Sequence, residues 1–283
     1  MSRLETSGAQ QWEPGVREAG IRSTRELPLA VALLALSAIA WLTIHHLATP
    51  DMRLGILTGA ARPSHSVEAM RPMPMRMPMG AGLFLAMWGV MMAAMMFPAV
   101  TPVVVRVSRL MRARGAGDGA AYAMIAGYFL VWCTAGLAAY GLFLALQAVV
   151  SVGDVLAVRA GAVILLVAGA YQLTPLKRAC LRQCRSPLAV VVRYGEGIVR
   201  SRTGALRVGI RHGAYCLGCC WALMAVLLAA GAMSLVWMGA VATVVLVEKI
   251  HRHGEALSRL LGSLLIVLAL AVAAEPDLLL TLT

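Results

Sequence analysis

The chain has 283 residues, of which 60% are hydrophobic and 13% are charged, and its formal net charge is +12. Soluble domains average about 45–50% apolar and about 25% charged residues, so this composition excludes an ordinary soluble enzyme. The basic residues cluster between apolar runs, which is typical of membrane proteins and not of nucleic-acid-binding domains. We therefore expect an integral membrane protein with no nucleic-acid partner.

Seven apolar runs predict an all-α, polytopic membrane helix bundle with six or seven transmembrane helices. Helices are expected because lipid offers no water to satisfy an open backbone. A spanning helix needs roughly 20 apolar residues, and the sixth run is short, which leaves the number of spans open by one. The runs cover residues 27–47, 81–103, 120–149, 157–176, 212–232, 234–248 and 257–275.

Arginine and lysine residues concentrate in alternate connections between these runs, which places those connections on the cytoplasmic side together with the N-terminus. Loop 48–80 also carries arginines although it falls on the outer side, and long loops follow the charge rule weakly. The predicted layout is a cytoplasmic tail over 1–26, a first helix over 27–47, a periplasmic Met/Pro-rich loop over 48–80, a bundle over 81–276 with a cytoplasmic basic loop at 177–211, and a tail over 277–283.

The expected outer loop contains the segment M-P-M-R-M-P-M, in which every second residue is methionine. Alternating prolines prevent a helix and favour an extended backbone. A thioether is a soft, uncharged ligand that suits monovalent copper. The segment is therefore either an outer site of metal capture or a compositionally biased linker. Its methionines are Met73, Met75, Met77 and Met79.

Methionines also recur at helical spacing in the second apolar run, on two adjacent lines of one helix. Methionine packs well between helices, so these side chains have a purely structural interpretation. The alternative is that they offer thioether ligands to a soft metal inside the bilayer. The first line holds Met87, Met91 and Met95, and the second holds Met92 and Met96.

The fourth run ends in Y-Q-L-T-P-L-K-R-A-C-L-R-Q-C-R-S-P, which carries two cysteines among basic residues. Cys180 and Cys184 are spaced i and i+4, so they are neighbours if this stretch is helical. Lys177 and Arg178 precede them, and positive charge is expected to lower the pKa of the thiols and favour the thiolate that binds metals. The alternative is that the basic residues only anchor the helix at lipid headgroups.

The segment Y-C-L-G-C-C-W holds three more cysteines at the start of an apolar run. Cys216, Cys219 and Cys220 share a helix face at i, i+3 and i+4, and Met224 continues that face by one turn. Thiols stay reduced in the cytoplasm, so we expect no disulfide here. Thiolates and thioethers favour monovalent copper, although a thiolate cluster also binds zinc.

Other residues near these cysteines are expected to play supporting roles. His212 precedes the triplet and Glu248 ends the sixth run, and we expect both beside the metal ligands, together with Lys177 and Arg178. Cys133 stands alone in the third run and is interpreted as a small buried hydrophobic residue. The chain has no G-x-x-x-x-G-K-[ST] phosphate loop, and its apolar runs are nearly free of acidic residues, which argues against a proton relay.

In combination, these motifs resemble a bacterial family of predicted metal-binding integral membrane proteins, some members of which are called copper chaperones. The resemblance runs from about Met87 to Lys249, and it leaves out the first helix and the methionine-rich loop. Where the family pattern leads us to expect asparagine, this chain has Ser234. The matching elements are W-G-V-M-M-A-A-M-M-F-P, G-Y with Trp132 following, Y-Q-L-T-P-L-K-R-A-C-L-R-Q-C-R-S-P, H-G-A-Y-C-L-G-C-C-W-A-L-M, G-A-M-S-L-V-W-M and V-E-K.

Residues and resemblance together predict a multi-pass protein of the bacterial inner membrane that binds, delivers or transfers monovalent copper through methionine and cysteine ligands. Its partners would be the lipid bilayer, the metal ion and a metal-carrier protein on the periplasmic or cytoplasmic side. Two alternatives stay open. One is a membrane thiol–disulfide oxidoreductase, and the other is a structural or assembly subunit whose cysteines are only packed. An enzymatic role is not favoured, and no catalytic residue is assigned.

Overall fold

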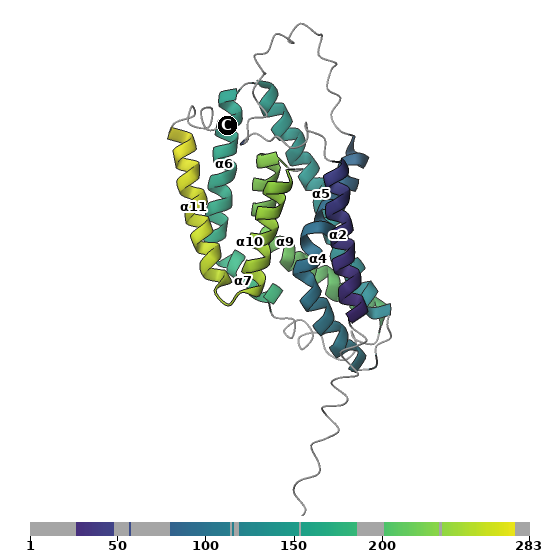
Figure 1. The fold of residues 1–283 in the computed structure, drawn as a ribbon. Coiled ribbons are helices and arrows are strands. Elements are labelled where there is room, and N and C mark those ends of the chain that lie inside the picture. Colours follow the sequence, from purple (N-terminus) through teal and green to yellow (C-terminus); the bar gives the residue numbers. More distant parts are fainter. Residues whose placement is uncertain are drawn as a thin grey trace, which may run out of the picture.

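The computed structural model describes residues 27–47, 57, 80–113, 115, 119–152, 154–185, 201–231 and 234–274, and within these residues there is no strand. The predicted all-α polytopic bundle is therefore confirmed (Figure 1). Its helices are α2 (Leu27–Leu47), α4 (Ala81–Ala113), α5 (Gly119–Val152), α6 (Asp154–Leu173), α7 (Pro175–Arg185), α9 (Arg202–Gly231), α10 (Leu235–Ile250) and α11 (Gly254–Ala274).

Six of these helices are long and apolar enough to cross a membrane, namely α2, α4, α5, α6, α9 and α11. The sixth apolar run forms α10, which has 16 residues and is shorter than a typical span of roughly 20 residues. In Figure 1, α10 nevertheless returns the chain from the end of α9 to the start of α11. Large apolar side chains such as Leu34, Leu137 and Leu264 are exposed on the outside of the bundle, where they would contact lipid.

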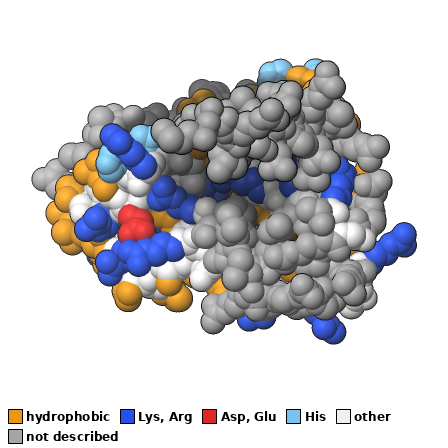
Figure 2. Space-filling model, turned by 90° about the horizontal axis from the view of Figure 1, so that it is seen from below, with side chains coloured by type: hydrophobic (Ala, Val, Ile, Leu, Met, Phe, Trp, Pro, Cys, Tyr) orange, Lys and Arg blue, Asp and Glu red, His pale blue; other side chains and the backbone are white. Residues whose placement is uncertain are grey.

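The helix directions bring the basic segments together at one end of the bundle. The last turns of α4, the whole of α7, the start of α9 and the connection from α10 to α11 lie at the lower end in Figure 1. Seen from below, this end shows lysine and arginine side chains around an acidic patch (Figure 2). These segments follow or precede alternate spans of the chain, and the helix arrangement gathers them at one end of the bundle.

Helix α2 is hydrogen-bonded to α4 at a backbone carbonyl group whose usual helical N–H partner is replaced by a proline. Pro98 has no N–H group, so the carbonyl oxygen of Ala94 loses its usual partner one turn further along α4. Ser37 Oγ donates to this oxygen at 2.7 Å and Trp41 Nε1 donates to it at 3.1 Å. The two side chains supply the hydrogen bonds that lipid cannot provide.

Helices α5 and α9 approach so closely that their backbones touch at glycines. A Cβ atom on Gly127 would overlap the carbonyl oxygen of Leu206, and one on Gly209 would overlap that of Met124. Small residues allow membrane helices to pack at such short distances. This contact positions the face of α5 that carries Tyr128 against the cysteine-bearing segment of α9.

We predict that Gly127→Ala destabilises the bundle, because its new methyl group meets backbone atoms that cannot move without separating α5 from α9. Overpacking of this kind costs about 1–3 kcal/mol, so thermal unfolding of the detergent-solubilised protein should occur at a lower temperature. Gly141→Ala is the matched control, since the same helix leaves open space around Gly141. Equal melting temperatures for the two variants would contradict the close α5–α9 contact.

Helix α7 exists as a separate element because of the dipeptide Thr174–Pro175. Proline disfavours a helical residue before it and is well suited to the first turn of a new helix, so α6 ends and α7 begins here. The Thr174 Oγ1 atom accepts a hydrogen bond of 3.2 Å from the backbone N–H of Lys177, which caps α7. The buried face of α7 then carries Lys177, Leu181 and Cys184.

Candidate metal centre

Three cysteines of α9 converge inside the bundle. Cys216, Cys219 and Cys220 are each 1% exposed, and their Sγ atoms all lie within 4.8 Å of one another. Metal–sulfur bonds are about 2.3 Å long, so sulfurs that share one ion lie no more than about 4.6 Å apart. The triplet is therefore already close to the spacing that a single ion requires.

The second cysteine group meets the first across the α7–α9 contact. Cys184 is buried, and its Sγ atom lies 3.8 Å from Cys219 Sγ. Cys180 is only partly buried and packs against α9 at Gly218, where an added Cβ atom would lie 2.8 Å from Cys180 Sγ. Packing thus brings together two cysteine groups that lie more than 30 residues apart in the sequence.

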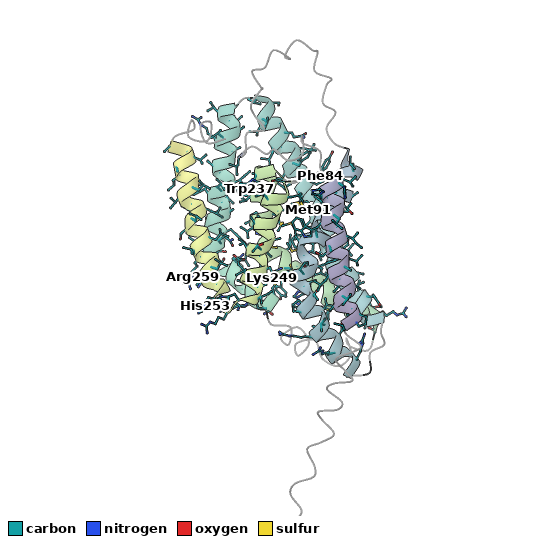
Figure 3. The ribbon with its side chains drawn as sticks, in the orientation of Figure 1. Phe84, Met91, Trp237, Lys249, His253 and Arg259 are labelled. Carbon is teal, nitrogen blue, oxygen red and sulfur yellow. The ribbon has the colours of Figure 1, made fainter. Side chains whose placement is uncertain are left out.

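Two polar groups from other helices contact the sulfur of Cys216. The Tyr128 hydroxyl of α5 lies 3.0 Å from Cys216 Sγ, and Lys249 Nζ of α10 donates to the same sulfur at 3.0 Å. The two contacts fix the position of this sulfur and place a positive charge beside it. Figure 3 shows Lys249 near the lower end of α10.

A buried ion pair between α7 and α10 also contacts α9, and it lies beside the clustered cysteines. Lys177 Nζ of α7 lies 2.7 Å from Glu248 Oε2 of α10, and the two side chains are 0% and 1% exposed. Lys177 also donates to the backbone carbonyl of Cys219 on α9. The expectation that Lys177 and Glu248 lie beside the cysteines thus agrees with the geometry, while Arg178 is half-buried on the neighbouring face of α7.

The electrostatic expectation for the α7 cysteines is wrong. Burial, followed by the nearby sulfur of Cys219, raises the pKa of the Cys180 thiol and outweighs the opposite effect of the Lys177 ammonium. Hydrogen bonds to Cys216 and Cys219, together with burial, hold the pKa of Cys184 well above its ordinary range. Because metal ligands are thiolates, metal binding at these two residues would release protons.

The remaining predicted residues lie around this centre or further along the bundle. Met224 and His212 of α9 are each 3% exposed, and His212 Nδ1 has no hydrogen-bond partner among the described residues. The α4 methionines belong to the same buried core as the cysteines, and Figure 3 shows one of them, Met91, further up the bundle than Lys249. These methionines, which are at most 6% exposed, are Met87, Met91, Met92, Met95 and Met96.

Two further predictions, one about Cys133 and one about the methionines of the outer loop, are not confirmed by the structure. Cys133 is exposed on α5, so the expectation that it is buried is wrong, and on a spanning helix an exposed position faces lipid. The methionines proposed for outer metal capture, Met73, Met75, Met77 and Met79, lie outside the described residues.

Sequence reasoning did not assign Tyr128 and Lys249 to the centre. A tyrosine inside an apolar helix and a lysine at the end of an apolar run are common for reasons of packing and headgroup contact. The available signal for Lys249 was its place at the end of an apolar run, where a charged side chain needs a partner. That partner is Cys216, while the adjacent Glu248 pairs with Lys177.

The bundle and its buried thiols define an integral membrane protein with the ligands for a metal ion. Residues 85–272 match the protein family PpoB2, described as a copper chaperone, and this stretch contains all six cysteines. The chain belongs to this family. No curated protein and no solved structure matches it.

We predict that Lys177→Met strongly destabilises the protein, because it leaves the Glu248 carboxylate buried without its partner. Breaking a buried pair in this way costs about 3–5 kcal/mol, which thermal unfolding in detergent would detect. The double variant Lys177→Met with Glu248→Leu should recover much of the loss. Arg182→Met is the control on the same helix, since the Arg182 side chain is 68% exposed in its pair with Glu255 and its loss should change little.

Proposed function

We propose that this protein is a membrane copper chaperone that binds monovalent copper at Cys216, Cys219, Cys220 and Cys184 and passes it to a carrier. The observation that supports this most directly is the convergence of the four thiols, three within 4.8 Å of one another and the fourth 3.8 Å from Cys219. The four proposed ligands are all sulfur atoms, and soft ligands favour monovalent copper over magnesium, calcium or manganese. Zinc is the competing ion, because four thiolates also satisfy its tetrahedral preference.

The methionines would extend this site along the bundle. In this proposal Met224, one turn beyond Cys220, and the α4 methionines offer thioether positions between the outer loop and the thiol centre. The loop methionines at 73, 75, 77 and 79 would collect copper on the periplasmic side. His212, Glu248, Lys177 and Arg178 would support the ligands without binding the ion.

The proposed orientation follows from charge. The basic end of the bundle would face the cytoplasm of a bacterial cell, with the N-terminus on the same side, since positively charged segments stay inside. The thiol centre lies at the α7 end and would therefore be in a reducing compartment, where free cysteines persist. A metal carrier on either side of the membrane would be the exchange partner.

We predict that the purified wild-type protein binds copper(I) tightly and that the triple variant with Cys216, Cys219 and Cys220 changed to Ser loses this binding. Loss of a single supporting residue around a metal lowers affinity about 10–100-fold, so removal of three ligands should exceed about 100-fold. The measurement is anaerobic competition against a chromogenic copper(I) chelator. Cys133→Ser is the matched control, because that thiol is exposed on α5. The copper(I) affinity of this variant should equal that of the wild type.

Copper(I) binding by the triple variant as tight as that of the wild type would rule out the thiol centre. Tighter binding of zinc than of copper by the wild type would instead indicate a zinc site. A reversible loss of two thiols on addition of a quinone, without metal binding, would support the oxidoreductase alternative. In that case Cys184 and Cys219 would be the expected pair, because their sulfurs are 3.8 Å apart.

A further inference from the structure

The five clustered cysteines differ sharply in their exposure. Cys184 is 4% exposed and the α9 triplet is 1% exposed, so an ion held by these four sulfurs is enclosed by protein. Cys180 is only partly buried and lies one turn before Cys184 on α7. Among the five, it is the thiol that a molecule outside the bundle can reach.

The structure also places Cys180 against the buried ligands. Its Sγ atom packs on Gly218, the residue between Leu217 and Cys219, in a space that a single methyl group would occupy. The Tyr171 hydroxyl donates to the carbonyl oxygen of Gly218 and holds this part of α9 in place. The partly exposed sulfur therefore adjoins the backbone that carries Cys219.

We propose that Cys180 is the exchange ligand that carries copper(I) between a thiolate-bearing carrier and the buried thiol centre, and that Gly218 keeps it within reach. This inference rests on the proposed function and adds the route by which the site loads and unloads. Copper chaperones must release their ion to a partner, and an ion enclosed by four buried sulfurs needs an intermediate ligand for that step.

The transfer is a sequence of ligand exchanges in which copper keeps its single positive charge. A copper–sulfur bond to the carrier breaks as a bond to Cys180 Sγ forms, and the Cys180 proton passes to the released carrier thiolate. The bond to Cys180 is then replaced by a bond to Cys219 or Cys184. The proton of that cysteine passes to the departing Cys180 thiolate, so atoms and charges balance.

The charge of the surrounding surface fits an anionic copper donor. Two thiolates bound to one copper(I) ion carry a net negative charge, and α7 presents basic side chains at the same end of the molecule (Figure 2). Arg182, two residues after Cys180, is 68% exposed. Opposite charges raise the rate of encounter more than the final affinity. The carrier class is therefore a thiolate–copper complex, which reaches the bundle at α7.

The test compares the rate and the equilibrium of copper transfer from a copper(I)–glutathione complex to the full-length protein in detergent. Cys180→Ser should slow the transfer at least about tenfold, since loss or displacement of a positioned group commonly costs up to about 100-fold in rate. Its equilibrium affinity, measured by chelator competition, should stay close to that of the wild type. Gly218→Ala should act in the same way although it keeps Cys180, and Cys133→Ser should change neither quantity.

Three results would overturn the proposal. A wild-type rate in Cys180→Ser would show that copper reaches the centre by another route. A loss of equilibrium affinity in Cys180→Ser as large as that of the triple variant would make Cys180 a permanent ligand. Failure of the wild type to bind copper would remove the proposed function as well, which distinguishes that failure from the first two. Thermal unfolding of each variant shows that a slower rate does not come from misfolding.

Discussion

The ammonium group of Lys177 needs partners inside an apolar bundle, and the arrangement of the centre depends on where it finds them. Its contacts with Glu248 of α10 and with the Cys219 carbonyl of α9 fix three helices around one point. Removing a charge from water is costly unless it is paired and hydrogen-bonded. Because α7 is held in this position, Cys184 reaches Cys219, and because Glu248 is held, the next residue of α10, Lys249, reaches Cys216.

Small residues determine how closely the other helices approach this point. The glycines at 127 and 209 allow α5 to touch the backbone of α9, and Tyr128 then lies within hydrogen-bond distance of Cys216. Gly218 leaves room for Cys180 in the same way. Membrane helices gain little from burying apolar surface against each other, because lipid is equally apolar, so close packing and hydrogen bonds carry the association.

A sulfur site inside a membrane bundle has two opposing requirements. Exclusion of water and of competing ligands favours tight binding, whereas delivery of the ion requires a ligand that an outside partner can reach. The four enclosed thiols, three on α9 and Cys184 on α7, meet the first requirement, and the partly exposed Cys180 on α7 meets the second. Lys249, beside Cys216, adds positive charge where bound thiolates would accumulate negative charge. This arrangement fits the proposed function, in which the protein would hold copper and also give it up.

The sequence by itself determined the membrane bundle, the face shared by Cys216, Cys219 and Cys220, and the family, because apolar length, helical period and local motifs are properties of short segments. It also identified Lys177 and Glu248 as neighbours of the cysteines. Only the tertiary structure decided that α7 meets α9 and that Tyr128 and Lys249 contact Cys216. It also decided that burial raises the pKa of Cys180 and that hydrogen bonds to Cys216 and Cys219 raise the pKa of Cys184. The helical periodicity of one segment does not predict which distant segment it contacts. The outward position of Cys133 was hidden for a related reason: a helix in lipid is apolar on all sides, so its sequence does not reveal which face is buried.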